Sequence, residues 1–183
     1  MRHLVCAGQP WGERVFDRVS RELHARAGWH CWFAPNGGGS GSALLETVAR
    51  LLPRYTFFLN WSRYVPASVL GRCECVNFHC TALPYGRGGH PIENLILRGH
   101  TETVMTAYRM NEFFDAGPIY GTRGPISLAG TKMMILERFV DPCADLIRWI
   151  ATTEPLPTPQ VGVTMRFGRL SPEAYDQFWA TRA

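Results

Sequence analysis

Asn77 and His79 are the residues of this 183-residue sequence whose types and spacing first suggest chemistry. They lie two positions apart near the end of an apolar stretch, and on an extended segment that spacing puts both side chains on one side. An amide can donate an N–H to a developing negative charge, and an imidazole can hold or move a proton near neutral pH. A carboxylate would orient the imidazole, and Asp115, in an Asp-Ala-Gly-Pro turn, is a candidate. The alternative is that these are ordinary hydrogen-bonding groups at a strand end.

Two glycine-rich segments could approach a substrate. The first, residues 83–91, reads Leu-Pro-Tyr-Gly-Arg-Gly-Gly-His-Pro, and the second is the run at 35–41. Neither contains the Gly-Lys-Ser/Thr sequence of a phosphate-binding loop. The first segment is therefore a tight turn or a substrate contact, and the second a connector that could touch a substrate.

Four residues of metal-ligating types lie close together in the sequence: Cys73, Cys75, His79 and Cys80. Cys and His are zinc ligands, but residues 73 and 75 share one face of a strand while 79 and 80 point to opposite faces. The spacing is therefore poor for a tetrahedral site. The chain has no CxxC pair, so we expect free, mostly buried thiols and no metal. The cysteines are at 6, 31, 73, 75, 80 and 143.

The elements that must position these residues alternate between strand and helix. Helical periodicity covers 12–27, and Ser42 is a plausible start for a helix through 52. Apolar runs of strand length occur at 3–7, 29–34, 55–59 and 74–78. Continuously apolar strands suit a sheet covered on both faces. We therefore expect an α/β fold: a Rossmann-like, mostly parallel twisted sheet with helices on both faces.

The second half of the chain continues this alternation. Because ligands sit at the carboxyl ends of parallel strands, we expect the polar residues to gather at that edge of the sheet. The expected elements are a helix from Pro91 to just before Gly99, a strand at 103–110, helical spacing over 131–152 with a break or kink near Pro142, an extended connector at 153–159, and a last helix beginning at Ser171.

Composition excludes several classes of protein. There is no apolar run of 18 residues, so no segment is expected to span a membrane, and the first apolar stretch is too short for a secretory signal. A cytoplasmic location is the default expectation. The net charge of +4 comes mostly from scattered arginines, which is weak evidence for an anionic substrate and poor evidence for a nucleic-acid groove. The aromatic content of 12% leaves room for a homodimer patch.

Three blocks, in order, resemble the folate-dependent formyltransferase family. They are Asn-Phe-His-Cys-Thr-Ala-Leu-Pro at 77–84, Arg-Gly-Gly-His-Pro at 87–91 and Asp-Ala-Gly-Pro-Ile at 115–119. The likeness is strongest over residues 55–121. Two positions depart from the family pattern, with Thr81 in place of a serine and Ala82 in place of the first leucine of a Leu-Leu-Pro hinge.

The resemblance implies a single formyltransferase catalytic domain over residues 1–183, closed by a helical segment at 171–183. It implies transfer of a formyl group from 10-formyltetrahydrofolate to a primary amine, with no metal. Asn77, His79 and Asp115 would be the catalytic residues. A fixed amide from Asn77 would stabilise the developing oxyanion, and an Asp beside His79 would favour the charged imidazolium.

The family also implies where the two substrates bind. The pterin would lie in a slot between the loop 61–65 and the segment 110–114, closed by the hinge leucine. The cofactor-binding residues expected by this carry-over are Trp61, Arg63, Tyr64, Val65, Leu83, Met110, Asn111, Phe113 and Phe114. The residues expected near the acceptor amine are Tyr85, Arg87, Gly89 and His90.

For the acceptor, the resemblance favours the amino group of a sugar on a nucleotide carrier. Another small amine, from an amino acid, a siderophore or an antibiotic precursor, is an open alternative. We expect no nucleic-acid partner, because little chain remains for the C-terminal barrel of the tRNA-directed members. Glycinamide ribonucleotide is disfavoured, because Gln-Pro-Trp-Gly stands at 9–12 in place of that group's phosphate-binding pattern. The rival reading from another class is a non-catalytic folate-binding module.

Overall fold

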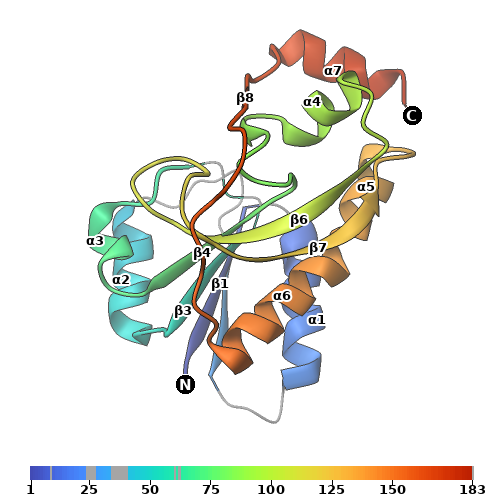
Figure 1. The fold of residues 1–183 in the computed structure, drawn as a ribbon. Coiled ribbons are helices and arrows are strands. Elements are labelled where there is room, and N and C mark those ends of the chain that lie inside the picture. The colour runs from blue at the N-terminus through green and yellow to red at the C-terminus, as the bar shows by residue number, and fades with distance from the viewer. Residues whose placement is uncertain (9, 24–27, 34–40, 60, 62, 183) are drawn as a thin grey trace.

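A six-stranded sheet forms the centre of the molecule (Figure 1). The computed structural model describes residues 1–183 apart from 9, 24–27, 34–40, 60, 62 and 183. The strand order is β2-β1-β3-β4-β6-β7. The first four strands in this order run parallel, and the last two pairings are antiparallel. The sheet is thus mixed but mostly parallel, in agreement with the sequence prediction.

The parallel half of the sheet alternates with helices. Its strands are β1 (His3–Ala7), β2 (Trp29–Phe33), β3 (Tyr55–Leu59) and β4 (Glu74–His79). The helices between them are α1 (Pro10–Leu23), α2 (Gly41–Leu51) and α3 (Ala67–Leu70). Every residue of β1 and β3 is buried, which explains why these strands lack a polar face in the sequence.

Two boundaries differ from the sequence prediction. Helix α1 begins two residues earlier than expected and ends at Leu23, and the expected continuation to 27 lies outside the described residues. Helix α2 begins at Gly41, so Ser42 lies in its first turn. Most of the glycine-rich run at 35–41 also lies outside the described residues, and its contact with a substrate stays a prediction.

An antiparallel pair completes the sheet. Strand β6 (Glu102–Arg109) is the strand expected at 103–110, and it pairs antiparallel with β4. Strand β7 (Ile119–Ser127) had no sequence prediction. It contains Gly121, Gly124 and Pro125, and seven of its nine residues are exposed or partly exposed, because it forms the edge of the sheet.

The helical spacing expected over 131–152, with a break or kink near Pro142, is confirmed as a break that lies just before the proline. Two helices occupy this segment, α5 (Lys132–Arg138) and α6 (Val140–Thr153), and they meet at Phe139. Pro142 lies in the first turn of α6, where a missing backbone N–H removes no intrahelical hydrogen bond. The break therefore comes before the proline.

The remaining elements gather at one end of the molecule (Figure 1). They are α4 (Pro91–Leu97), α7 (Pro172–Ala180), and a small two-stranded sheet of β5 (Arg87–Gly88) and β8 (Arg166–Phe167). The expected start of α7 is confirmed, because the Ser171 hydroxyl accepts a hydrogen bond from the backbone N–H of Ala174. Between α6 and β8 runs an extended segment, residues 154–165, which we call the strap (Figure 1).

Helices cover both faces of the sheet, as predicted. On one face α1, α5 and α6 bury a core that includes Val15, Ile135 and Leu146. On the other face α2 packs over a smaller core with Leu44 and Val48. Within the described residues, no helix has both the length and the apolar character needed to cross a membrane.

The alternation of side chains along β4 decides where the candidate site lies. Val76 and Phe78 belong to the larger core, and Cys75 belongs to the smaller core on the α2 side. Asn77 and His79 therefore project to the α2 side of the sheet, as their spacing predicted. The short helix α3, a single turn, precedes this strand.

Candidate active site

Asn77 and Tyr108 face each other across the antiparallel pair β4 and β6. The side-chain amide of Asn77 donates a hydrogen bond to the Tyr108 hydroxyl at 2.8 Å. The same hydroxyl donates to Oδ1 of Asp115 at 2.7 Å. All three side chains are buried, so these bonds lie in a medium of low dielectric where polar interactions are strong.

Asp115 lies in a turn that two other segments hold in place. Its backbone adopts a left-handed conformation, with a φ of 54°. Its second carboxylate oxygen, Oδ2, accepts a hydrogen bond from the backbone N–H of Gly88 at 2.8 Å. A Cβ on Gly117 would lie 1.7 Å from the carbonyl oxygen of Arg109, so only glycine fits two residues after the aspartate. The Asp-x-Gly spacing thus has a steric cause.

A hydrogen bond from Nε2 fixes the orientation of the His79 ring. Nε2 lies 2.7 Å from the carbonyl oxygen of Gly86, and because a carbonyl only accepts, Nε2 carries a hydrogen. Nδ1 faces Oδ1 of Asp115 at 3.8 Å, which is longer than a direct hydrogen bond. A proton on Nδ1 would therefore point toward the carboxylate, with no direct hydrogen bond at this separation.

The three residues that the sequence singled out thus meet in space. Asn77 reaches Asp115 through one hydroxyl, and His79 faces the same carboxylate oxygen. The arrangement can supply an amide, a proton carrier and a carboxylate to one place, and the roles of these groups in catalysis stay a prediction.

Tyr108 keeps its proton in this setting. Burial, followed by the negative charge of Asp115, raises the pKa of Tyr108 well above its ordinary value of 10. A neutral phenol has one hydrogen to donate and lone pairs to accept with. Tyr108 can therefore link a donor on one side to an acceptor on the other.

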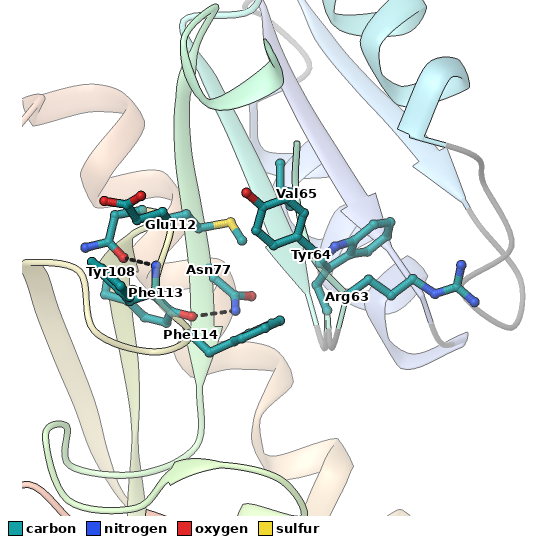
Figure 2. Close-up of a pocket in the computed structure, with 11 residues that line it drawn as sticks. Arg63, Tyr64, Val65, Asn77, Tyr108, Glu112, Phe113 and Phe114 are labelled. Atoms are coloured by element: carbon teal, nitrogen blue, oxygen red, sulfur yellow. Dashed lines mark hydrogen bonds between the residues drawn. The ribbon is translucent and has the colours of Figure 1, made fainter. Parts of the chain in front are cut away.

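A pocket opens directly beside Asn77 (Figure 2). It contains about 330 Å³ of empty space, part of which is open to solvent. Its lining comes from the segment after β3, from β4 and β6, and from the segment before Asp115. The lining residues are Trp61, Arg63, Tyr64, Val65, Asn77, Tyr108, Met110, Asn111, Glu112, Phe113 and Phe114. His79 and Asp115 are not among them, so they stand behind Asn77 and Tyr108 as seen from the pocket.

The pocket matches most of the predicted cofactor slot. Eight of the nine predicted residues line it, and Leu83, which is buried, does not. Asn77, Tyr108 and Glu112 line it in addition. Ser62, in the first predicted loop, lies outside the described residues. Binding of a pterin by these residues stays a prediction.

The chemistry of the lining suits a flat heteroaromatic group. Tyr64, Phe113 and Phe114 are each more than half exposed at the rim. Figure 2 shows Asn77 between Tyr64 on one side and Tyr108 on the other. Oδ1 of Asn77 is buried and has no hydrogen-bond partner within the described part of the chain. A buried acceptor without a partner is costly, and a ligand N–H would satisfy it.

The four residues predicted to contact the acceptor have partners inside the protein. The Tyr85 hydroxyl lies 3.1 Å from Nε2 of His100, and Arg87 donates to Oε1 of Gln160. Nδ1 of His90 accepts from the backbone N–H of Leu170 at 3.0 Å. Gly89 packs so closely on Arg169 that a Cβ would lie 2.2 Å from that side chain. Contact of these residues with an acceptor stays a prediction.

Two residues that matter to the site were missed in the sequence. Tyr108 depends on antiparallel pairing, and Gln160 depends on the strap returning to the Asp115 turn. Gln160 donates to the carbonyl oxygens of Asp115 and Gly117 at 2.9 and 2.8 Å. The strict alternation of residues 103–110 was the only available signal for Tyr108, and no local motif marks Gln160.

The cysteine cluster contains a thiol pair. Sγ of Cys73 lies 3.7 Å from Sγ of Cys75, and within the described ranges no group of three or more metal-ligating side chains occurs. The hydrogen bond from Cys75 lowers the pKa of Cys73 to about 7, and the same contact together with burial raises the pKa of Cys75. Among the described side chains, Cys6, Cys73, Cys75, Cys80 and Cys143 form no disulfide.

Comparison with known proteins agrees with this geometry. The sequence pattern of the family described as formyl transferase matches residues 19–142, which is more than half of the chain. The chain belongs to the formyl transferase family. The matched residues include all three of Asn77, His79 and Asp115, and they end within the first turn of α6.

Relatives in the formyl transferase family include methionyl-tRNA formyltransferases. The chain is 39% identical over 123 residues to "Methionyl-tRNA formyltransferase" of Thermobifida fusca, an alignment that covers 64% of this chain and 34% of that protein. The chain thus spans about a third of the length of the curated relatives it matches.

Several solved structures share the fold. A methionyl-tRNA formyltransferase from Clostridium thermocellum superposes with a TM-score of 0.82 at 28% identity, covering 94% of this chain and 74% of that one. HypX from Aquifex aeolicus, in complex with tetrahydrofolic acid, gives 0.76 at 19% identity, covering 95% of this chain and 30% of that one. A sugar N-formyltransferase from a Shewanella species gives 0.71 at 16% identity, covering 92% and 76%.

Proposed function

We propose that this protein transfers a formyl group from 10-formyltetrahydrofolate to a primary amine. The observation that carries the proposal is the meeting of Asn77, His79 and Asp115 beside an aromatic pocket, in a chain of the formyl transferase family. The residues fit the co-substrate, because the pocket offers aromatic faces and one buried amide oxygen without a partner. Bound there, the co-substrate would supply the activated formyl group.

The transfer exchanges one C–N bond for another. A bond forms between the acceptor nitrogen and the formyl carbon, and the bond from that carbon to N10 of the folate breaks. The acceptor nitrogen loses one proton and N10 gains one, so no oxidant, reductant or metal is needed. The protein must therefore hold the developing charge on the formyl oxygen and move one proton.

The side chains divide these tasks. The Asn77 amide would bind the formyl oxygen or an N–H of a substrate, because it reaches the pocket. His79 and Asp115 would take the proton from the acceptor amine, because Nδ1 and Oδ1 face each other at 3.8 Å and catalytic hydrogen bonds commonly shorten when the substrates bind. Val65 and Tyr108, both buried, would exclude water from the floor of the pocket.

Two acceptor classes are in competition. The sequence blocks favour an amino sugar on a nucleotide carrier, and another small amine is an alternative. The names of the relatives favour the α-amino group of methionyl-tRNA instead, and this second candidate rests on identities of 30–39%. The nucleotide-linked sugar and the methionyl-tRNA both carry phosphate, which agrees with the net charge of +4, whereas the small-amine alternative need not.

The test is turnover with a panel of acceptors. The full chain is incubated with 10-formyltetrahydrofolate and nucleotide-linked amino sugars, small amines or methionyl-tRNA, and release of tetrahydrofolate and the mass of the product are followed. We expect formylation of one class and its loss in His79→Ala. Tight folate binding with no product from any amine would instead establish a non-catalytic folate-binding module.

A further inference from the structure

Tyr108 is the only connection between Asn77 and Asp115 that the described residues provide. Its hydroxyl lies 2.8 Å from the amide nitrogen of Asn77 and 2.7 Å from Oδ1 of Asp115. The tyrosine is 2% exposed, and Asn77 and Asp115 are 5% and 7% exposed. Water therefore has little access to these two bonds, and each must be satisfied by the protein.

Counting hydrogens fixes the direction of this chain. An ionised carboxylate only accepts, and Asp115 accepts from Tyr108 at Oδ1 and from the N–H of Gly88 at Oδ2. The single hydrogen of the phenol is thereby used, so its oxygen must accept from Asn77. The amide then turns its nitrogen inward and leaves Oδ1 without a partner beside the pocket.

The opposite direction requires one more proton. If Asp115 is protonated on Oδ1, its O–H donates to the phenol oxygen, and the phenol hydrogen turns toward Asn77. The amide then has to present Oδ1 to Tyr108 and its NH₂ to the pocket, because a hydrogen-bond donor needs an acceptor. One proton enters at Asp115, two hydrogen bonds reverse, and no other group changes its charge.

We propose that Tyr108 is a positioning residue that couples the protonation of Asp115 to which end of the Asn77 amide faces the substrates. This proposal rests on the proposed function and deepens it. Before the transfer, Asn77 offers an acceptor to the N–H of the incoming amine. Once Asp115 has taken up the amine's proton, Asn77 offers a donor to the charge on the formyl oxygen, at the stage when that charge has formed.

The surroundings of Asp115 fit such a relay. Among the described residues, the ionisable side chains that interact with its charge include His79, which faces it at 3.8 Å, Tyr108 and Cys80. Burial raises the pKa of Cys80 to about 12, so this thiol stays neutral. Of these three neighbours, His79 is therefore the one that can carry the proton to Asp115 as a cation.

Strand β7 supplies a matched control. Tyr120 is 7% exposed, and its hydroxyl donates to the carboxylate of Glu74, outside the candidate site. Tyr108→Phe and Tyr120→Phe each remove one buried hydroxyl that donates to a carboxylate. If Tyr108 has a purely structural role, the two variants should show the same Asn77 amide signal and the same kcat and KM.

The first experiment does not depend on turnover. Asn-selective ¹⁵N labelling, with Asn77→Ala for assignment, reports the Asn77 side-chain amide, and ¹³C labelling of Asp reports the Asp115 carboxyl. We expect the two signals to titrate with one midpoint in the wild type and in Tyr120→Phe. In Tyr108→Phe the amide signal should no longer follow the carboxyl. The proposal is overturned if the Asn77 amide signal does not change with protonation of Asp115 in the wild type. It is also overturned if the amide signal follows the carboxyl signal equally well in Tyr108→Phe.

The second experiment measures kcat and KM. We expect Tyr108→Phe to lower kcat at least tenfold. Removal of an oxyanion donor itself typically lowers kcat by about 10²–10³. KM for 10-formyltetrahydrofolate should stay within about twofold, because the aromatic ring that lines the pocket is kept. Tyr120→Phe should leave both constants unchanged. If the wild type formylates no amine, the proposed function fails, whereas an unchanged kcat in Tyr108→Phe with an active wild type rejects the relay alone.

Discussion

Gln160 holds the backbone of Asp115 from the opposite end of the sequence. Its side-chain NH₂ donates to the carbonyl oxygens of Asp115 and Gly117, and its side-chain oxygen accepts from both Nε and Nη2 of Arg87. One amide in the strap thus ties together the turn that carries the carboxylate and the strand that carries Gly88. The position of the Asp115 side chain depends on a residue that lies 45 positions away.

Gln160→Glu should damage the site while keeping the size of the side chain. The carboxylate can still pair with Arg87, but its oxygens would face two carbonyl oxygens that have lost their donor. We expect a loss of about 1–3 kcal/mol in the free energy of unfolding and a lower kcat. The check is urea unfolding together with initial rates. Gln177→Glu, the same charge change at an exposed position of α7, is the control and should alter neither.

Asp115 should separate the effect of charge from the effect of backbone conformation. Asn tolerates a positive φ and Ala does so poorly, so Asp115→Ala should be less stable than Asp115→Asn by about 1 kcal/mol. Both variants lack the carboxylate, and both should lose formyl transfer by at least about 100-fold. Urea unfolding and single-time-point product analysis measure the two effects. A near wild-type rate in Asp115→Asn would show that no carboxylate is required.

His3 should make the protein less stable in weak acid. Burial and the nearby N-terminal amino group lower its pKa from 6.5 to about 4, with a smaller opposing effect from Glu154 and a further lowering by Arg54. Above pH 6.5 both folded and unfolded chains hold a neutral imidazole. Between about pH 6.5 and 4 only the unfolded chain takes up the proton, so stability falls as the pH falls, by at most about 3 kcal/mol from this group.

The check is urea unfolding of His3→Phe at several pH values across that window. The new ring can pack against Trp29 and Tyr55, as the imidazole does. We expect the variant to lose less stability than the wild type between pH 6.5 and 4. His30→Phe, on the neighbouring strand, is the control. Equal pH dependence in the wild type and His3→Phe would mean that His3 is protonated in the folded protein.

Cys73 should be the most reactive of the described thiols at neutral pH. Its pKa of about 7 makes roughly half of it thiolate there, whereas burial raises the pKa of Cys143. Alkylation with iodoacetamide, followed by peptide mass mapping, should give a rate that rises with pH through about 7. In Cys75→Ala the donor to Cys73 is lost, and the rate at pH 7 should fall several-fold. An unchanged rate would mean that Cys75 does not stabilise the thiolate.

The parallel half of the fold could be predicted because its signals are local. The runs that became β1 and β3 are apolar except for His3 and Thr56, and both strands are buried on both faces. The meeting of Asn77 with His79 followed from a two-residue spacing in one strand. The place of Asp115 came from an ordered set of motifs, which carries information that periodicity alone does not.

The rest depends on long-range pairing that leaves little trace in the sequence. Strand β7 looks like a loop because its glycines and its proline suit an edge position. Tyr108 has a role only because β6 runs antiparallel to β4 and places it opposite Asn77. A break or kink was expected near Pro142, and the exact place of the break, at Phe139, depends on the burial of that ring in the core.

The strap also sets where the chain tolerates a change of length. Thr158 pairs with Ile119 through two backbone hydrogen bonds. Two residues later, Gln160 donates a hydrogen bond to the Asp115 turn. An insertion between Thr158 and Gln160 would move the Gln160 amide away from the Asp115 turn that it holds. Val161 and Val163, both more than four-fifths exposed, begin a stretch where added residues could bulge outward without disturbing that grip.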